Sequence, residues 1–396
     1  MNRNLILLMA SQCMVTAGTV LVVTIGGIVG TALAPEAALA TVPMSLMVVG
    51  TAMTAVPAAL LMRRIGRRRG FSLAALAAVG AALLGAGALW LESFVLFCLA
   101  TLLIGAKVAF SQQYRFAAAE SVAPTAAGRA VSLVLLGAVG GAFIGPELAT
   151  RAAALVDGVE FAGSFLALAV VFVVATGLLY LMVEPVVAAA PEVELPRRPL
   201  RAIARQPLFV IAVLGGVVGQ GVMTFVMTAT PISMHVLDGF TLAETAGVIR
   251  AHVLAMYVPS LASALLIGWL GIGRLMGLGL GMFVATLVIA LQGHEYLHYW
   301  GSLLLLGIGW NFLFVGGTSL LVQSYRPEER FTAQAANDFC VFGVAALGSL
   351  LAGSVVHVVG WEGVLWGSLP LLAVMAGALA WLALLRRSDG PRAKAV

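Results

Sequence analysis

Long apolar runs, separated by short breaks rich in charge, proline or glycine, fill most of this chain. Each run reaches the roughly 20 residues that an α-helix needs to cross a bilayer. The runs are continuous and do not alternate with a period of two, so a porin-like barrel is disfavoured. The pattern predicts twelve spans, at 5–33, 38–62, 70–91, 94–121, 130–152, 161–184, 207–235, 243–269, 273–292, 299–323, 332–357 and 362–386.

A polar segment interrupts this pattern midway along the chain. Residues 185–206 hold four prolines, two glutamates and four arginines, and no apolar run there is long enough to span. The composition predicts a linker between two halves of six spans each. The expected organisation is an N-terminal six-helix bundle (1–184), a cytoplasmic linker (185–206), a C-terminal six-helix bundle (207–386) and a cytoplasmic tail (387–396).

The two halves resemble each other in sequence. Three sets of positions align at the nearly equal offsets of 204, 205 and 208: 103–110 with 307–314, 61–66 with 266–271, and Gln12 and Thr16 with Gln220 and Thr224. Such agreement indicates an internal duplication. Internal repeats are typical of transporters that bind their solute at the membrane midplane between the repeats.

Composition and charge place the whole chain in a membrane. Of 396 residues, 61% are hydrophobic and 10% are charged, whereas soluble domains carry about 25% charged residues. Of the 22 lysines and arginines, 3 are expected inside the membrane (Lys107, Arg115 and Arg250), 1 on the side opposite the termini (Arg151) and 18 on the side of the termini. This excess fixes both termini in the cytoplasm by the positive-inside rule, and it requires no nucleic-acid partner. We expect an all-α integral membrane protein.

A basic loop and a glycine-proline pair resemble motifs of the major facilitator superfamily. The family's loop pattern, Gly-x3-Asp-Arg-x-Gly-Arg-Arg, falls on residues 59–68 between the second and third spans. Four positions match: Arg64, Gly66, Arg67 and Arg68. With twelve spans arranged as six plus six, the resemblance covers the chain and implies two pseudo-symmetric bundles that transport a solute by alternating access.

Two motifs match the family only in part. In the fifth span, Gly141-x3-Gly145-Pro146 resembles the core of the family's antiporter motif, but Ala149 and Thr150 replace its closing glycines. The match therefore favours antiport only weakly. Residues 112–120 resemble a bacterial branch of the family associated with vitamin or flavin uptake.

The basic loop also departs from the family pattern, because Ala59 replaces a glycine and Arg63 an aspartate. The resemblance implies a cytoplasmic gate in which Glu120 accepts Arg67 or Arg64. It also implies that Arg63 pairs with Asp338 of the eleventh span, with the usual polarity swapped. The alternative is that Arg63 only adds to the cytoplasmic cluster, while Asp338 caps a local network or takes a proton.

Four polar side chains share one stripe of the fourth predicted span. Helical spacing places Lys107, Ser111, Tyr114 and Arg115 on one face. An ionisable group in a span costs roughly 2.5–3.5 kcal/mol on insertion scales, so Lys107 needs a partner or a water-filled cavity. We expect this face to line the central cavity, where Lys107 binds an anionic or carbonyl-bearing solute. A structural lysine paired with a carboxylate of its own bundle is the alternative.

The tenth predicted span carries Trp310 and Asn311 at the depth that the repeat pairs with Lys107. A flat aromatic ring beside an amide donor suits a ring-bearing solute. Because neighbours on a helix point in different directions, we expect only one of the two to face the cavity, and ordinary packing of Trp310 is the alternative. Uncharged polar residues of the first and seventh spans either contact the solute or hydrogen-bond between helices: Gln12, Thr16, Gln220 and Thr224.

Glu147 directly follows Pro146 within the fifth span. A buried carboxylate has a raised pKa and can carry a proton at neutral pH, so we expect Glu147 or Asp338 to couple transport to protons. The alternative for Glu147 is a salt bridge to Lys107 or to Arg151, its i+4 neighbour.

Arg250 lies in the outer third of the eighth span, where it attracts an anion, pairs across the two halves or reaches the interface. His252, His294 and His298 have only Glu295 near them at ligand spacing, so no metal site is expected. The three cysteines have no ligand spacing either. No phosphate loop and no catalytic triad can be placed, so the sequence predicts neither a cofactor nor an enzyme.

These features predict a monomeric secondary active transporter of the bacterial inner membrane, which moves a small polar or anionic organic solute, of vitamin or flavin type by the resemblance. Its partners are the solute, the lipid bilayer and protons. One rival is proton-coupled efflux of drugs or metabolites. Another is a membrane protein that moves no solute, such as a lipid-handling or assembly factor, although a polar face around Lys107 would be needless there.

Overall fold

The computed structural model describes residues 3–114, 117–118, 121–122, 127–183, 198–326 and 329–388, and these residues are helical with short connections. The first half contains α1 (Arg3–Leu33), η1 (Ala37–Leu39), α2 (Val42–Ile65), α3 (Arg67–Trp90), α4 (Phe94–Ser111), α6 (Ala127–Thr150), η3 (Ala152–Leu155) and α7 (Ala162–Tyr180). The second contains α8 (Leu200–Ala204), α9 (Pro207–Pro231), η4 (Ile232–Leu237), α10 (Leu242–Tyr257), α11 (Ser260–Leu270), α12 (Ile272–Ala290), α13 (Tyr296–Ser324) and α14 (Arg330–Ser388).

The twelve predicted spans are confirmed when α10 and α11 are counted together as one span and α14 is counted as two. Ten helical stretches of the described chain are long and apolar enough to cross a membrane. The predicted span 243–269 is two shorter helices, α10 and α11, because Pro259 has no N–H to donate and its ring disrupts the preceding turn. Conversely, α14 joins two predicted spans through Gly360, whose φ of 82° breaks the helix.

The fourth predicted span is interrupted: α4 ends at Ser111, residues 112–113 form a turn, and Tyr114, Ala117 and Ala118 are helical again. The amide of Gln113 donates to the Phe110 carbonyl three residues back, a tightening that commonly ends an α-helix. Residues 115–116 and 119–120 lie outside the described chain.

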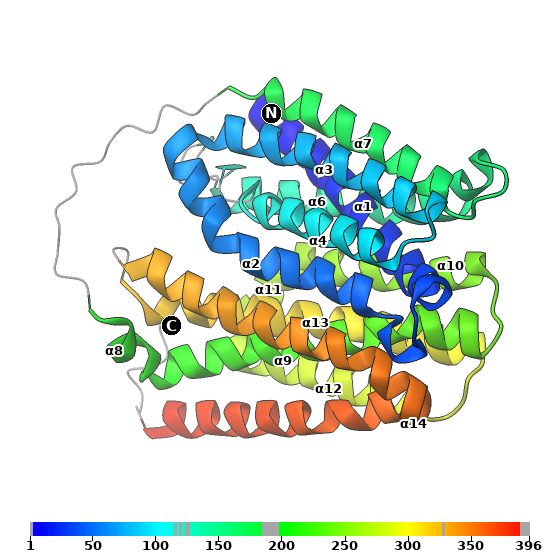
Figure 1. Ribbon diagram of the computed structural model, residues 1–396. Coiled ribbons are helices and arrows are strands. Elements are labelled where there is room, and N and C mark those ends of the chain that lie inside the picture. The colour runs from blue at the N-terminus through cyan, green and yellow to red at the C-terminus, as the bar shows by residue number, and fades with distance from the viewer. Residues whose placement is uncertain are drawn as a thin grey trace.

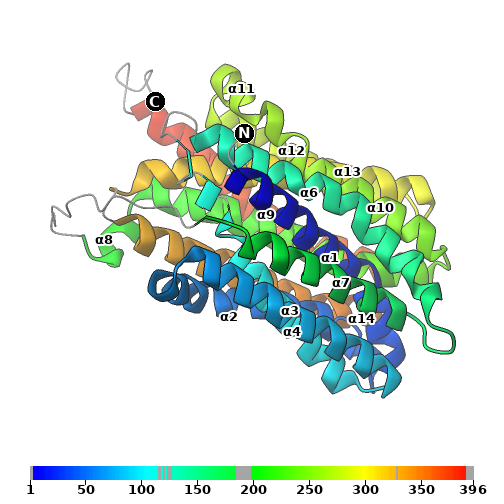
Figure 2. The same ribbon diagram turned by 90° about the horizontal axis from the view of Figure 1, so that it is seen from above.

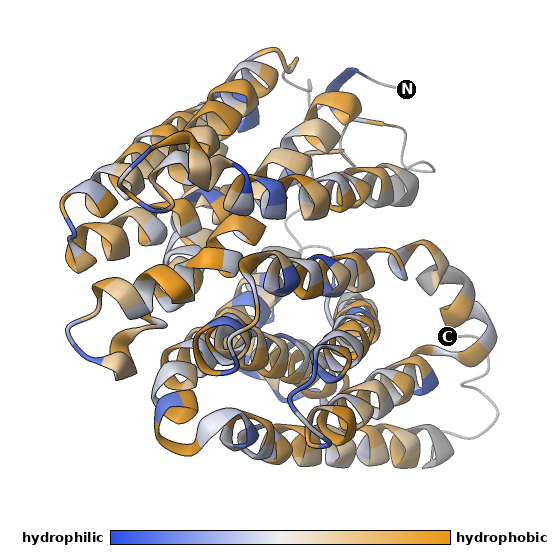
Figure 3. Ribbon diagram, turned by 90° about the vertical axis from the view of Figure 1, so that its right-hand side faces the viewer, coloured by the Kyte–Doolittle hydropathy of each residue, from blue (hydrophilic) through white to orange (hydrophobic). Residues whose placement is uncertain are grey.

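The helices run along one common direction between two ends of the molecule (Figures 1 and 2). We call the end that carries both chain termini and α8 the termini end, and the opposite end the far end. Helices α1–α7 form the N-terminal bundle and α9–α14 the C-terminal bundle. Seen from the far end, the bundles lie side by side, and hydrophilic residues are confined to short stretches of a largely apolar ribbon (Figure 3).

The internal repeat predicted from the sequence has a structural counterpart. Gly66, between α2 and α3, has φ 87° and ψ 159°, and Gly271, between α11 and α12, has φ 76° and ψ 158°. A positive φ strongly favours glycine. The two bundles therefore make the same sharp turn at positions 205 residues apart, as the predicted alignment requires.

Candidate functional site

Lys107 lies inside the N-terminal bundle with 2% of its surface exposed. Its Nζ donates to the Tyr114 hydroxyl at 2.6 Å and lies 4.8 Å from the centre of that ring. Tyr114 is itself buried and packs edge-on against Phe71. Among the described residues no carboxylate pairs with Lys107, so the positive charge has one neutral protein partner there.

The rest of the predicted polar face of the fourth span is only partly described. The Ser111 hydroxyl is buried and donates to the Val108 carbonyl at 2.6 Å. Arg115 lies outside the described residues. The structure thus brings Lys107 and Tyr114 together, while Ser111 bonds to its own helix.

The paired polar residues of the first and seventh spans adopt the same local arrangement. Gln12 donates to the Thr16 hydroxyl at 3.3 Å, and Gln220 donates to the Thr224 hydroxyl at 3.2 Å. Each bond joins residues four apart on α1 or α9. The repeat therefore extends to side-chain geometry, and both glutamine–threonine pairs are intrahelical.

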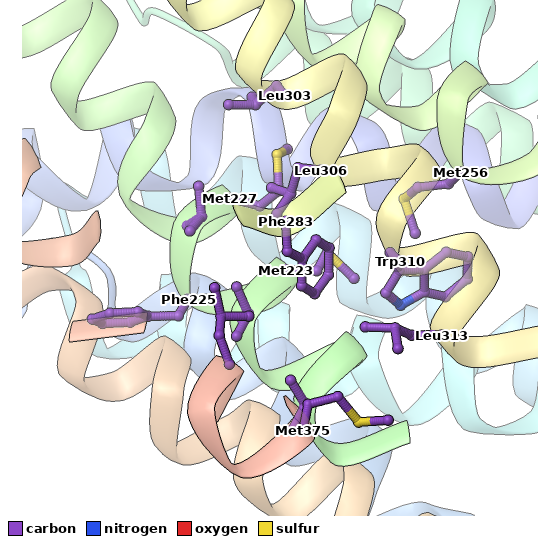
Figure 4. Close-up of a cluster of buried hydrophobic side chains, with 14 of the residues drawn as sticks. Met223, Phe225, Met227, Met256, Phe283, Leu303, Leu306, Trp310, Leu313 and Met375 are labelled. Carbon is purple, nitrogen blue, oxygen red and sulfur yellow. The ribbon is translucent and has the colours of Figure 1, made fainter. Parts of the chain in front are cut away.

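Trp310 belongs to this polar group through Gln220. Its indole N–H donates to Gln220 Oε1 at 2.8 Å, which links α13 to α9. Phe314 stacks on the indole with centroids 4.8 Å apart, and Tyr257 meets it edge-on at 6.1 Å. Figure 4 shows Trp310 at the edge of an apolar cluster that includes Met256 and Leu313. Trp310, Phe314 and Tyr257 thus form an aromatic group with the polar side chain of Gln220 at its edge.

Asn311 points elsewhere, toward the break between α10 and α11. Its amide nitrogen lies 2.7 Å from the Met256 carbonyl and 2.6 Å from the Ser260 hydroxyl. A helix broken near Pro259 leaves carbonyls without their usual i+4 donors, and Asn311 supplies one. Of the two neighbours, Trp310 rather than Asn311 joins the Gln220 group.

A set of small polar residues that sequence reasoning missed joins the bundles in their far-end halves. The hydroxyl of Ser45 on α2 donates to that of Ser349 on α14 at 2.9 Å, and Thr228 on α9 lies 2.9 Å from the same hydroxyl. Gly353 lies directly against Thr41, where an added Cβ would be 2.2 Å from Oγ1. We call these five residues the far-end seam; serines and threonines in apolar spans were the available signal.

An ion pair also crosses between the bundles toward the far end. Glu147 of α6 lies 2.5 Å from Arg151 Nε and 3.3 Å from the guanidinium of Arg250 on α10. The Arg250 guanidinium also sits 5.7 Å from the Phe143 ring. Among the described residues, the seam and this ion pair both join the two bundles, and both lie toward the far end.

At the termini end, the predicted gate residues are described only in part. Arg64 is exposed, and Arg67 donates to the Gln113 carbonyl at 3.2 Å. Asp338 is half-buried and accepts from Asn337 at 3.1 Å. The side chain of Arg63 and the whole of Glu120 lie outside the described residues, so their pairings stay predictions.

The histidines are dispersed. Buried His252 has its Nδ1 2.8 Å from the Leu303 carbonyl, whereas His294 and His298 lie in the loop and first turn between α12 and α13. In the described part of the chain, no three or more His, Cys, Asp or Glu side chains form a group suited to a metal ion.

Comparison with known proteins identifies the family. A model described as Major Facilitator Superfamily matches residues 7–256. The chain is 39% identical over 375 residues to the riboflavin transporter RfnT of Brucella anthropi, which covers 94% of each chain. It is 29% identical over 377 residues to the uncharacterized MFS-type transporter YddS of Bacillus subtilis, covering 90% of this chain and 85% of that one.

Solved structures show the same fold at low identity. A bacterial homologue of the human lysosomal transporter Spinster, in an inward-facing and occupied conformation, has a TM-score of 0.70 and 12% identity, over 97% of this chain and 96% of that one. The human organic anion transporter MFSD10 has a TM-score of 0.68 and 15% identity, over 95% and 99%. With the family model and the RfnT similarity, these matches show that the chain is not an enzyme but a multi-pass membrane transporter that belongs to the major facilitator superfamily.

Proposed function

We propose that this protein transports riboflavin or a closely related flavin across the bacterial inner membrane as a monomer. The observation that carries the proposal is 39% identity, over 94% of both chains, to a protein named as a riboflavin transporter. An alignment of that extent includes nearly all of the chain and hence most of the helices that carry the candidate site.

The chemistry of the candidate site supports this solute. The flavin ring system is flat and bears two carbonyl oxygens, and riboflavin adds a chain of hydroxyl groups. Trp310, which is buried and stacks on Phe314 in this state, would offer its indole to the flavin ring when the site opens, while Gln12 and Gln220 offer amides for hydroxyls. Lys107, whose described partner is a neutral phenol, gains a second acceptor when a solute carbonyl reaches it. The two bundles would thus hold opposite sides of one solute.

We infer that the termini end faces the cytoplasm. Eighteen of the 22 lysines and arginines belong to that side of the predicted topology, as the positive-inside rule requires. The far end, closed by the seam and by the Glu147–Arg250 pair, then faces outward. The arrangement therefore corresponds to a state closed to the outside.

Protons are the proposed coupling ion, with Glu147 as the first candidate to carry one. Two arginines contact this carboxylate, and one of them, Arg250, belongs to the other bundle. Protonation would weaken its attraction to Arg250 and so join proton binding to opening of the far end. Asp338 is the second candidate.

The pairing of Arg63 with Asp338 stays part of this proposal as the cytoplasmic gate. Arg63→Asp and Asp338→Arg should each impair transport, and the double swap should restore much of it, because only a direct pair has coupling energy to recover. Additive losses would dismiss the pair and leave Asp338 as a proton site.

Uptake by whole cells tests the proposed solute. A bacterium unable to make riboflavin, expressing this chain, should accumulate labelled riboflavin above cells with an empty vector. Excess unlabelled riboflavin or lumiflavin should compete, whereas ribitol, which lacks the ring, should not. Uptake equal to that of vector cells, with the protein shown to be in the membrane, would reject a flavin as the solute.

A further inference from the structure

Three acidic or basic side chains from distant parts of the chain meet at the far end of the C-terminal bundle. Asp238 follows η4, His294 lies in the loop between α12 and α13, and Glu362 follows the break at Gly360 in α14. His294 Nδ1 is 3.0 Å from Asp238 Oδ2, and Nε2 is 2.8 Å from Glu362 Oε1. We call these three residues the clasp.

The geometry of the clasp requires a protonated histidine. Carboxylates only accept hydrogen bonds, and a neutral imidazole has a single N–H, so it can serve one carboxylate and turns a lone pair toward the other. With both ring nitrogens at hydrogen-bond distance from carboxylates, the imidazolium satisfies both contacts. Loss of one proton therefore breaks one of the two links and leaves two carboxylates near a neutral ring.

The clasp continues into the bundle through a chain of hydroxyls. The Tyr299 hydroxyl donates to Asp238 Oδ2 at 2.7 Å. The Ser233 hydroxyl lies 2.6 Å from that of Tyr299 and is its donor, because the phenol proton is engaged by Asp238. Ser233 and Tyr299 are buried, whereas His294 is 41% exposed. Protonation of His294 at the surface is therefore linked, through Asp238 and Tyr299, to the hydrogen bond of buried Ser233.

That serine belongs to η4, a π-helical turn at the end of α9. Turns of this type are rare and often occur at functional sites. The same turn contacts the N-terminal bundle: a Cβ built on Gly27 of α1 would lie 3.2 Å from Ile232 Cγ1. The segment that the clasp fastens therefore lies where the two bundles meet at the far end.

We propose that Asp238, His294 and Glu362 form a proton-binding site that holds η4 against α1 and so favours closure of the far end when the medium on that side is acidic. This inference concerns the closed state and does not depend on which solute is carried.

The expected pH range follows from the surroundings of His294. Its hydrogen bond to Glu362 raises its pKa above the ordinary 6.5; partial burial opposes this, and Asp238 adds to it. A raised pKa means that the clasp is complete below about pH 6.5 and is lost as the pH rises through the raised value. Other ionisable groups on these segments or on elements that pack against them are His235, Glu295, His298, His357, Glu36 beside η1, and Glu244 and Arg250 of α10.

Distances between spin labels on the two bundles test the proposal. Leu155 of η3 and Leu297 of α13 are 72% and 70% exposed at the far end, so each accepts a label as cysteine once Cys13, Cys98 and Cys340 are replaced. Electron–electron distance measurements should show one short population at about pH 6, and a longer population should grow toward about pH 8.5. For each unit by which closure raises the pKa of His294, the ratio of the short-distance to the long-distance population can change up to about tenfold over this pH range.

The variants separate the clasp from other titrating groups. His294→Gln should remove the pH dependence, because the amide does not titrate. His298→Gln is the matched control: this ring lies in the next helical turn and accepts from the Glu295 amide at 3.3 Å, so the pH dependence should persist. Glu362→Gln, at a half-exposed position, should move the transition to lower pH.

Two results would overturn the proposal. One is a distance distribution that does not change with pH in the parent protein. The other is a pH response of His294→Gln equal to that of the parent. Should His294→Gln fail to fold, an unmoved transition in Glu362→Gln rejects the clasp by itself.

Discussion

Lys107 places an ionisable amine inside a membrane bundle with a phenol as its described partner. A buried charge without a counter-ion is costly in a span, and such residues commonly mark solute or ion pathways. Tyr114 meets part of that need through a hydrogen bond at 2.6 Å and through its ring. In the proposed function, the remaining donors of this side chain bind carbonyl oxygens of the solute.

We predict that Lys107→Ala weakens binding of riboflavin by about 1.5–3 kcal/mol, roughly 10- to 100-fold, the scale of a charge-assisted hydrogen bond. Quenching of flavin fluorescence on titration with purified protein measures the affinity. Tyr114→Phe is the matched control, since it keeps the ring and the lysine but removes the hydroxyl, and its affinity should change less. Equal affinity of Lys107→Ala and the parent would remove Lys107 from the site.

For single residues, the sequence could predict which ionisable side chains lie in the membrane, but less well which way a side chain points. An ionisable residue in an apolar run can be read from composition alone, so Lys107 and Glu147 could be singled out. The orientation of Asn311 could not, because it depends on carbonyls freed at Pro259 of another helix. The seam was missed for a similar reason: Ser45 and Ser349 are 304 positions apart, and nothing local marks them as neighbours.

α14 contacts the N-terminal bundle closely at a residue without a side chain, Gly353, which faces Thr41 at the start of α2 and Ala38 of η1. Thr41 and the Ala38 carbonyl would lie 2.2 and 3.1 Å from a Cβ on Gly353. The nearer atom is the hydroxyl oxygen of Thr41, which belongs to a short side chain, and the Ala38 carbonyl is backbone, so neither can move aside as the end of a long flexible side chain does. The far-end closure of these two elements therefore depends on glycine at this position.

We predict that Gly353→Ala disfavours the far-closed state by about 1–3 kcal/mol, the usual effect of overpacking, or roughly 5- to 100-fold in its population. The Leu155–Leu297 label pair reports that population, and uptake should fall with it. Gly343→Ala is the control on the same helix, since nothing lies within 4 Å of a Cβ there. A Gly353→Ala protein as fully closed as the Gly343→Ala protein would contradict this account of the seam.

An ion pair between Arg198 and Glu329 fixes the end of the linker to the C-terminal bundle. Arg198 donates through Nε and Nη2 to Glu329 at 2.7 Å each, and its amide adds a bond at 3.1 Å. Arg326 donates its amide to the same carboxylate at 3.0 Å. Hydrogen bonds from Arg198 lower the pKa of Glu329 to about 2 in spite of its burial. Residues from 198 onward thus belong with the bundle that follows.

The lowered pKa of Glu329 predicts how stability depends on acid. Its contribution is complete above the ordinary pKa of 4.5 and is lost as the pH falls toward about 2. Glu329→Gln should lower the free energy of unfolding near neutral pH by about 1–3 kcal/mol, and the difference from the parent should shrink on acidification. Thermal unfolding in detergent across this range measures it; a difference that does not vary with pH would contradict the charge-based explanation.

For the whole molecule, hydrophobic pattern and repeat offsets were enough to predict twelve helices in two related bundles. A span must be apolar over a fixed length, so its existence is a local property. The breaks within a span are harder to predict from local sequence. Pro259 divides one predicted span into α10 and α11, while Gly360 gives α14 a non-helical break that separates two predicted spans. How the bundles meet depends on residues hundreds of positions apart, which no window along the sequence contains.

The contacts named above assign one state to the whole molecule, with the bundles joined at the far end through the seam and the Glu147–Arg250 pair. A transporter that works by alternating access must break these contacts once in each cycle and re-form them. The seam hydroxyls and the Glu147–Arg250 ion pair can separate without unfolding either bundle.

Entrance counterflow with the purified protein in liposomes tests the central claim most directly, because it requires both flavin binding and repeated opening of each end. Liposomes loaded with unlabelled riboflavin and diluted into labelled riboflavin should accumulate the label transiently above its equilibrium level. Protein-free liposomes should not, and the Lys107→Ala protein should do so far less. A folded, membrane-inserted protein that gives no transient accumulation of riboflavin would contradict the account.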